Sequence, residues 1–253
     1  MTQWHLVLDG RCPSKRNMTR DAALFQSLIE KKHQGILRIY NWEEPAVTVG
    51  YHQKSFTLSD PNLTLPILKR PTGGGAVLHV DDITFSICAP SRGPFSRGII
   101  DACGTISKIF ARALRSCGLE VEMKGENTAF SDVCFMRSTP VELHLMGSKI
   151  LGLALLRRSG CILFQGVMPL RVDRDLSTRV FGDGNDPGTP GICDRAPDFS
   201  QDEFVGFLLD SFSSQIGVSF LEGSHDDHEH DEGDEGKVDL RRHDPGNERL
   251  TDQ

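Results

Sequence analysis

Residues 69–79, Lys-Arg-Pro-Thr-Gly-Gly-Gly-Ala-Val-Leu-His, combine a cation with a stretch of chain that has no side chains. The planar guanidinium of Arg70 can bind a carboxylate or an acyl phosphate at two points. Gly73, Gly74 and Gly75 allow a substrate to lie against the backbone, where main-chain N–H groups can hold its carbonyl or phosphate. A flexible turn between strands would have the same composition, so the triplet alone leaves both interpretations open.

The elements on either side of this triplet must position it. Residues 45–53 form a β-run that ends near Gly50, and residues 83–87 form another. Farther along the chain, residues 147–154 read Gly-Ser-Lys-Ile-Leu-Gly-Leu-Ala and lead into a further strand-like run. These flanks favour a functional loop over a simple turn.

The two blocks, in this order, resemble the catalytic domain shared by lipoate-protein ligases, octanoyltransferases and biotin ligases. Residues 70–79 are similar to the family pattern R-x-T-G-G-G-A-V-x-H, and residues 147–154 to G-x-K-[IV]-x-G-x-A. The resemblance covers roughly residues 1 to 216. It implies that Arg70, the glycine triplet, His79 and Gly152 bind the substrate, and it places Lys149 on the central lysine of the second block.

Cys134 is followed by Phe135, then by Glu142-Leu143 and then by Lys149. This order is similar to that of the octanoyltransferases that charge the glycine-cleavage H protein, which implies that Cys134 is the nucleophile. A thiolate that attacks a thioester retains the acyl activation, so neither a cofactor nor a metal is expected. The ammonium of Lys149 would lower the thiol pKa and donate to the developing oxyanion. An ordinary exposed strand lysine is the alternative for Lys149.

Some positions depart from the family patterns. Cys193 is the second candidate nucleophile, because another octanoyltransferase branch carries its cysteine in a late N-P-C-G-like turn, although the residues around Cys193 match that turn poorly. Leu153 and Leu155 stand where relatives usually have the polar residues of G-S-A-Q, and Gln165 stands where they often have the histidine of H-G. These changes put the handling of an adenylate in doubt and indicate a divergent substrate.

Charge and hydropathy bound the remaining possibilities. The chain of 253 residues carries a net charge of −7, and residues 223–253 hold 11 Asp+Glu against 4 Lys+Arg, which leaves 24 of each in the rest. Because residues 1–222 carry no net charge, the sequence does not indicate the excess of basic residues that is typical of a nucleic-acid-binding protein. No apolar run is long enough to span a membrane, and the first residues lack a signal-peptide pattern, so a cytoplasmic protein is expected.

The composition predicts a catalytic domain over residues 1–222 and an acidic tail over 223–253. The tail has too few apolar residues to order itself, and its histidines 225, 228 and 230 are better explained by a solvated tail than by a metal site. The seven cysteines form no C-x-x-C pair, so neither a zinc site nor a disulfide framework is indicated.

The hydrophobic pattern predicts an α+β domain, a mostly antiparallel sheet with helices packed on one side, like the biotin/lipoate-protein ligase catalytic domain. A first helix is expected to begin at Thr19, a second to cover residues 99–117, and a last one to end near Gly217. Residues 76–78 and 83–87 are expected to form a hairpin, residues 47–50 to pair near 36–40, and residues 183–197 to form a loop. Further strands are expected at 4–8, 67–70, 120–123, 141–145, 150–155 and 161–168.

Taken with the resemblance, the residues favour an acyltransferase of lipoate biosynthesis and protein lipoylation. The enzyme would move an octanoyl or lipoyl-type chain from an acyl-carrier-protein thioester through Cys134 to a lysine of a lipoyl-accepting carrier protein, the glycine-cleavage H protein or a dehydrogenase subunit. An ATP-dependent lipoate-protein ligase and a non-catalytic acyl-carrier-binding subunit are the alternatives. Chain length, acceptor, oligomeric state and the role of the tail stay undetermined by the sequence.

Overall fold

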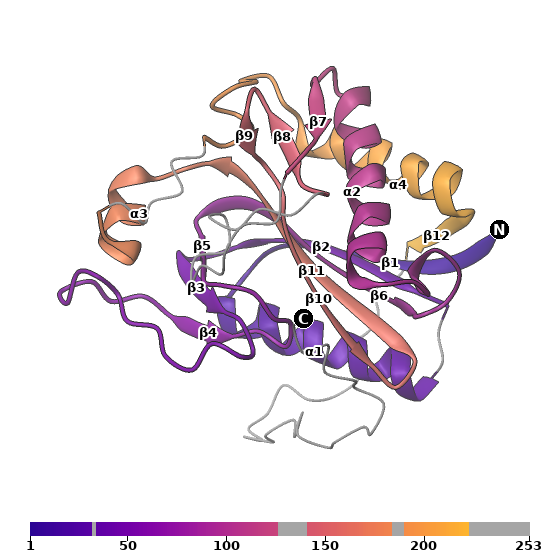
Figure 1. Cartoon of the computed structure of the whole chain (residues 1–253), viewed down its shortest axis with the longest axis horizontal. Helices are drawn as coiled ribbons and strands as arrows, with labels where there is room; N and C mark the ends of the chain where they lie inside the picture. The colour runs from indigo at the N-terminus through magenta and orange to yellow at the C-terminus, as the bar shows by residue number, and fades with distance from the viewer. Residues whose placement is uncertain (32–33, 126–140, 184–189, 223–253) are drawn as a thin grey trace, which may run out of the picture.

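The computed structural model describes residues 1–31, 34–125, 141–183 and 190–222. In this part of the chain a central six-stranded sheet has the order β10-β11-β6-β2-β1-β12 (Figure 1). Its strands are β1 (Thr2–Cys12), β2 (Ile36–Trp42), β6 (Asp81–Pro90), β10 (Gly152–Arg158), β11 (Cys161–Arg171) and β12 (Val218–Glu222). Two three-stranded sheets accompany it, in the orders β4-β3-β5 and β7-β8-β9. Their strands are β3 (Ala46–Val49), β4 (Ile67–Lys69), β5 (Val77–His79), β7 (Val121–Met123), β8 (Leu143–Leu145) and β9 (Ser148–Lys149).

The central sheet is mostly antiparallel, as the hydrophobic pattern predicts. The neighbours β10 and β11, β11 and β6, and β6 and β2 run antiparallel. Only β1 runs parallel to its neighbours β2 and β12. The helices are α1 (Ser14–Lys31), α2 (Ile99–Ser116), α3 (Arg174–Phe181) and α4 (Gln201–Ile216), with a 3₁₀ turn η1 at Gly93–Phe95. The prediction of an α+β domain is therefore confirmed.

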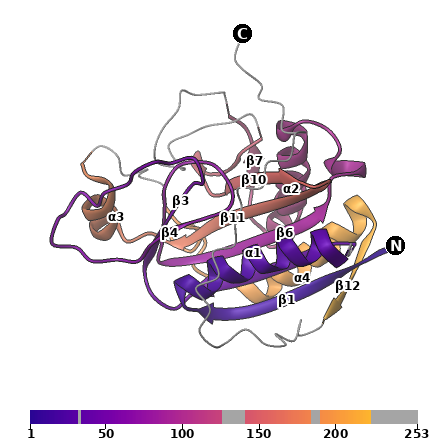
Figure 2. The same ribbon diagram turned by 90° about the horizontal axis from the view of Figure 1, so that it is seen from below.

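Helices cover both faces of the central sheet, which corrects the expectation that they pack on one side. Alternate residues of β2 point in opposite directions. Leu37 joins the core cluster built with α2 and α4, whereas Ile36 joins the cluster that contains Leu24 and Phe25 of α1. Figure 2 shows α1 lying along the sheet on the side nearest the viewer. Because β2 is buried on both faces, nearly all of its residues are buried rather than every second one.

The predicted second helix is confirmed at both ends, and the last helix is confirmed at its C-terminal end. Helix α2 ends at Ser116, and Gly118 follows with φ +80°, a left-handed conformation that glycine adopts without strain. Gly217 after α4 has φ +70° for the same reason. Helix α1 begins at Ser14, earlier than predicted, because the Thr19 hydroxyl donates to the carbonyl of Lys15 within the helix instead of capping it.

The expected hairpin of residues 76–78 and 83–87 is wrong. Strand β5 pairs with β3 in the small sheet, whereas β6 pairs with β2 and β11 in the central sheet. The chain thus changes sheets at Val80, between His79 and Asp81. Strand β3 likewise lies in the small sheet rather than beside β2. Because the chain passes from the small sheet to the central sheet at Val80, side chains of both sheets line the same pocket.

Helix α3 was not predicted, and Asp173 at its N-terminus accepts a hydrogen bond from the N–H of Leu176 at 2.9 Å. Among the described residues, no helix combines the length and the apolar character that a bilayer-spanning segment needs.

Candidate active site

A pocket lies where the small β4-β3-β5 sheet meets β10 and β11, and it encloses about 350 Å³ including its open mouth. Three residues predicted from the sequence line it, namely Arg70, His79 and Gly152. The rest of the lining is mainly apolar, with further polar side chains from β2, β3, β6 and β11. The apolar side chains are Met18, Trp42, Val77, Leu153, Ala154 and Val167, and the further polar ones are Tyr40, Thr48, Thr84 and Gln165.

Arg70 holds the glycine loop in place. Its Nη2 donates to the carbonyl oxygens of Gly73 and Gly75, at 2.7 Å each, and its Nη1 donates to the carbonyl oxygen of Thr48 at 3.1 Å. The side chain is buried, so these charge-assisted bonds form away from competing water. The structure therefore gives Arg70 a role as a clamp on the loop, while its contact with a substrate stays a prediction.

Glycine is required at two positions of this loop region by close approach. A Cβ on Gly50 would lie 2.0 Å from the carbonyl oxygen of Gly74, and a Cβ on Gly74 would lie 2.8 Å from Nη2 of Arg70. Gly74 also has φ +95°, in the left-handed region. In a trans peptide the N–H points opposite to the carbonyl, so the N–H of Gly74 points away from the guanidinium that binds the carbonyl of Gly73.

The imidazole of His79 is held on three sides. Its Nδ1 lies 3.0 Å from Oδ2 of Asp82, and its Nε2 lies 3.0 Å from Oγ1 of Thr48. The ring stacks on the indole of Trp42 with centroids 4.0 Å apart. His79, Asp82 and Thr48 are all buried. The sheet change at Val80 brings this set together, and the sequence pattern did not single out Thr48 or Asp82.

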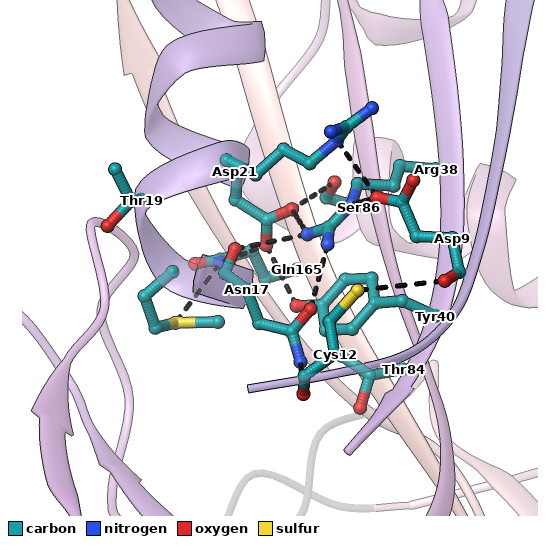
Figure 3. Close-up of polar contacts among 12 residues, drawn as sticks. Asp9, Cys12, Asn17, Thr19, Asp21, Arg38, Tyr40, Thr84, Ser86 and Gln165 are labelled. Atoms are coloured by element: carbon teal, nitrogen blue, oxygen red, sulfur yellow. Dashed lines mark hydrogen bonds and ion pairs between the residues drawn. The ribbon is translucent and has the colours of Figure 1, made fainter. Parts of the chain in front are cut away.

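A buried polar network supports the wall of the pocket beneath Tyr40 and Gln165 (Figure 3). The carboxylate of Asp21 accepts hydrogen bonds from Arg38 Nη1 at 2.7 Å, Ser86 Oγ at 2.7 Å, Tyr40 Oη at 2.9 Å and Gln165 Nε2 at 2.7 Å. Burial and the negative charge of Asp21 raise the pKa of Tyr40 well above its ordinary value. Burial, the largest single effect, would lower the pKa of Arg38, but the charge of Asp21, the effect of Tyr40 and the hydrogen bonds to Asp9 and Asp21 together outweigh it, so the pKa rises. Arg38 and Tyr40 thus keep their protons at physiological pH.

Gln165 connects this network to the glycine loop. Because the Asp21 carboxylate only accepts hydrogen bonds, the amide NH₂ of Gln165 faces Asp21 and its Oε1 faces the loop. There Oε1 accepts a hydrogen bond from the hydroxyl of Thr72 at 2.9 Å. Both polar ends of Gln165 are therefore satisfied within the protein, and Gln165 fastens the loop to the central sheet.

Lys149 lies on β9 and, among the described residues, is not one of those that line the pocket. Its Nζ donates to Oε1 of Glu142 at 2.6 Å, and both side chains are buried. Oε2 of Glu142 lies 3.8 Å from Nε2 of His144. A carboxylate this close cancels much of the field of the ammonium at longer range. Hydrogen-bond donation by Lys149 is therefore better supported than a long-range effect on a thiol pKa.

Cys134 lies outside the described residues. The six described cysteines are free, and none of them is among the residues that line the pocket. Burial raises the pKa of the Cys193 thiol, and the carboxylates of Asp81 and Asp194 raise it further against the opposing effect of Arg171. Cys193 is a poor thiolate for that reason. Within the described ranges no group of three or more His, Cys, Asp or Glu side chains could hold a metal ion.

Comparison with known proteins identifies the family. Residues 13–197 match the model of the lipoyl protein ligase A/B catalytic domain. The octanoyltransferase LipM of Carboxydothermus hydrogenoformans is 33% identical over 187 residues, which cover 71% of this chain and 70% of that one. LipM of Bacillus cereus is 32% identical over 189 residues, covering 68% and 67%.

Solved structures agree on the fold. Lipoate-protein ligase A bound with ATP superposes with a TM-score of 0.66 at 23% identity, covering 88% of this chain and 89% of that one. A putative lipoate protein ligase of T. acidophilum superposes with a TM-score of 0.65 at 25% identity and the same coverage. The matched region contains the glycine loop, His79, Lys149 and Gly152. The chain therefore belongs to the lipoyl protein ligase A/B catalytic-domain family.

Proposed function

We propose that this protein is an octanoyltransferase that acts on a lipoyl-accepting carrier protein. The observation that carries the proposal is the match to LipM octanoyltransferases over about two thirds of the chain, combined with the pocket described above. An octanoyl chain is saturated and apolar, and the lining of this pocket is mainly apolar. The polar groups in the lining are suited to the carbonyl end of the acyl chain.

Leu153 supports a plain hydrocarbon substrate. It stands at a position where relatives usually carry a polar residue, and it lines the pocket. Leu155, two positions farther along β10, packs against the main core cluster as Leu153 does, but it is not among the residues that line the pocket. The amide of Gln165 makes its hydrogen bonds with Asp21 and Thr72, so it is already satisfied without a polar group on the substrate. Leu153 thus fits an apolar acyl site and Leu155 fits the core, so neither leucine requires loss of catalysis.

The proposed reaction has two steps. The thiolate of Cys134 attacks the thioester of an octanoyl acyl-carrier protein, a C–S bond to the enzyme forms, and the carrier leaves as its thiolate. A lysine amine of the acceptor protein then attacks the octanoyl-enzyme, so that an amide forms, the amine gives up one proton, and the Cys134 thiolate is released. Lys149, hydrogen-bonded to Glu142, would donate to the oxygen on which negative charge develops.

Intact-mass spectrometry tests this proposal. Incubation with octanoyl acyl-carrier protein in the absence of ATP should add one octanoyl group, and a lipoyl domain should then remove it. The Cys134→Ala variant should form no adduct. Turnover that requires free octanoate and ATP and passes through no octanoyl-enzyme would instead identify an ATP-dependent ligase. Carrier binding without any transfer would identify a non-catalytic subunit.

A further inference from the structure

Three buried side chains, two of them in the lining of the pocket, form a continuous hydrogen-bonded line. Asp82 Oδ2 lies 3.0 Å from Nδ1 of His79, and Nε2 of His79 lies 3.0 Å from Oγ1 of Thr48. Thr48 and His79 both line the pocket. The line therefore runs from a carboxylate in the sheet interior to a hydroxyl at the pocket wall.

The donors and acceptors along this line follow from their chemistry. A carboxylate only accepts hydrogen bonds, so the proton of the neutral imidazole is on Nδ1, facing Asp82. Nε2 is then an acceptor, and the hydroxyl of Thr48 must donate its single hydrogen to it. The oxygen of Thr48 keeps its lone pairs and is polarised toward taking up another proton.

Trp42 and Thr84 hold the carboxylate of Asp82 in its position beside His79. The indole N–H of Trp42 donates to the hydroxyl of Thr84 at 2.8 Å. That hydroxyl is thereby oriented to donate to Oδ1 of Asp82, at 2.5 Å. A carboxylate that accepts from both sides is well placed to stabilise an imidazolium, as is the indole ring stacked on His79.

Among the described residues, the Thr48 hydroxyl oxygen accepts one long hydrogen bond. Nη1 of Arg70 lies 3.4 Å from Oγ1 of Thr48, beyond the usual length of a good hydrogen bond, and it makes its shorter bond to the Thr48 carbonyl oxygen. An amine that enters the pocket could replace this long contact. Arg70 would stay attached to the glycine loop through Gly73 and Gly75.

We propose that Thr48, His79 and Asp82 form a proton relay for the second step of the reaction, a role that rests on the proposed function. As the neutral lysine amine attacks the octanoyl carbonyl, the N–C bond forms and the nitrogen carries one proton too many. That proton passes to Thr48 Oγ1 while the Thr48 proton passes to His79 Nε2. The C–S bond breaks and Cys134 leaves as the thiolate that the first step uses, while the proton taken up by His79 returns through Thr48 to solvent, so the balance is one proton moved from nitrogen to water.

The relay predicts that the two half-reactions respond differently to Thr48→Val, which removes the hydroxyl and keeps the shape. Formation of the octanoyl-enzyme, followed by intact mass, should proceed at the wild-type rate. Single-turnover transfer from the isolated octanoyl-enzyme to a lipoyl domain should slow by about 10²-fold or more, the usual contribution of general acid–base catalysis. Thr48→Ser should retain most of the transfer rate, because serine restores the hydroxyl.

Further variants separate a relay from a packing effect. Asp82→Asn should slow the same step, because an amide that donates to Nδ1 forces the proton onto Nε2, where it blocks donation by Thr48. Hydroxylamine is largely unprotonated at neutral pH and needs less help from a base, so it should release octanoate from Thr48→Val nearly as fast as from wild type. Thr105→Val on α2, where the hydroxyl donates to the main-chain oxygens of Pro94 and Asp101, is the control and should change neither step.

Distinct outcomes would overturn the relay. Equal slowing of both steps by Thr48→Val, or equal slowing with lysine and hydroxylamine, would mean that Thr48 acts through structure alone. Normal lysine transfer by Thr48→Val would also exclude the relay. An octanoyl adduct that persists in Cys134→Ala and disappears in Thr48→Val would make Thr48 the nucleophile. If the wild-type protein forms no adduct at all, the proposed function itself fails, and the relay fails with it.

Discussion

The buried pair of Lys149 and Glu142 allows the catalytic and structural contributions of Lys149 to be measured separately. The two groups are 2.6 Å apart, and their side chains are 8% and 7% exposed. Lys149→Met removes the ammonium but leaves a carboxylate in the interior, where a charge without its partner is costly. Glu142→Gln creates the opposite situation. The double variant carries neither charge.

The magnitudes follow from this burial. Breaking a buried ion pair by removing one partner typically costs about 3–5 kcal/mol. His144 lies 3.8 Å from the second oxygen of Glu142 and offers partial compensation, so we expect the lower value, about 3 kcal/mol, for Lys149→Met. For a protein of this size that corresponds to a fall in Tm of about 6–12 °C. The double variant should recover about 2 kcal/mol of this loss, a coupling typical of groups in direct contact.

Calorimetric unfolding of the four proteins, combined with single-turnover acyl transfer, provides the assay. The double variant should unfold closer to wild type than Lys149→Met does, yet both should transfer octanoate about 10²- to 10³-fold more slowly, the usual cost of removing one oxyanion donor. The ion pair of Lys124 and Glu122 is a matched control: its atoms are 2.8 Å apart, but the side chains are 49% and 68% exposed. Lys124→Met should leave both Tm and transfer nearly unchanged.

Two results would refute this reasoning. If the stability losses of the single variants simply add in the double variant, Lys149 and Glu142 are not coupled as their distance implies. If the double variant recovers both stability and transfer, Lys149 serves only to neutralise Glu142 and has no part in catalysis.

The remaining predictions concern the nucleophile, the tail and two glycines. Cys134→Ala should abolish the octanoyl adduct seen by intact-mass spectrometry. Cys193→Ala should leave the adduct, because burial raises the pKa of the Cys193 thiol. The reverse result would assign the reaction to Cys193. Deletion of residues 223–253 should change Tm little, since the sequence there has few apolar residues, and a drop of many degrees would contradict a tail that does not pack. Gly166→Ala should lower Tm strongly, because the new Cβ would lie 2.1 Å from the ring of Phe85 in the core. Gly206→Ala in α4 should raise stability by about 0.5–1 kcal/mol, because nothing lies within 4 Å of its Cβ position. Equal effects of the two substitutions would show that the core at Gly166 can relax.

Patterns of residues close together in the sequence predicted the helices and strands whose conformation depends mainly on neighbouring residues. The repeat of apolar residues every three to four positions gave helix α2 within one residue of its observed end, and Gly118 marked its C-terminus correctly. The alternation and β-propensity of the strands gave an α+β domain with a mostly antiparallel sheet. The failure at α1 has a local cause of a different kind, since Thr19 has two possible hydrogen-bonding roles and takes the one within the helix.

The sequence by itself determined the glycine loop and the members of the site that lie in recognisable blocks. Arg70, His79 and Gly152 were predicted as site residues, and the structure brings all three to one pocket. The sequence predicted glycine at position 74 for close approach of a substrate, whereas the structure gives another reason, because a Cβ there would meet the guanidinium that holds the loop. Backbone conformation and residue type are properties of a short segment, and a short segment is enough to predict them.

Only the tertiary structure decided which polar groups face one another. Gln165 and Asp21 are 144 positions apart in the chain. Their hydrogen bond exists because α1, which carries Asp21, packs against β11, which carries Gln165. The change of sheet at Val80 similarly brings Asp82 of the central sheet to His79 and Thr48 of the small one. A side chain in a sequence has many possible partners of suitable chemistry, and long-range packing of buried surfaces selects one of them. Because these groups are buried, their pairing contributes to the stability of the fold, since an unpaired polar group in the interior is costly.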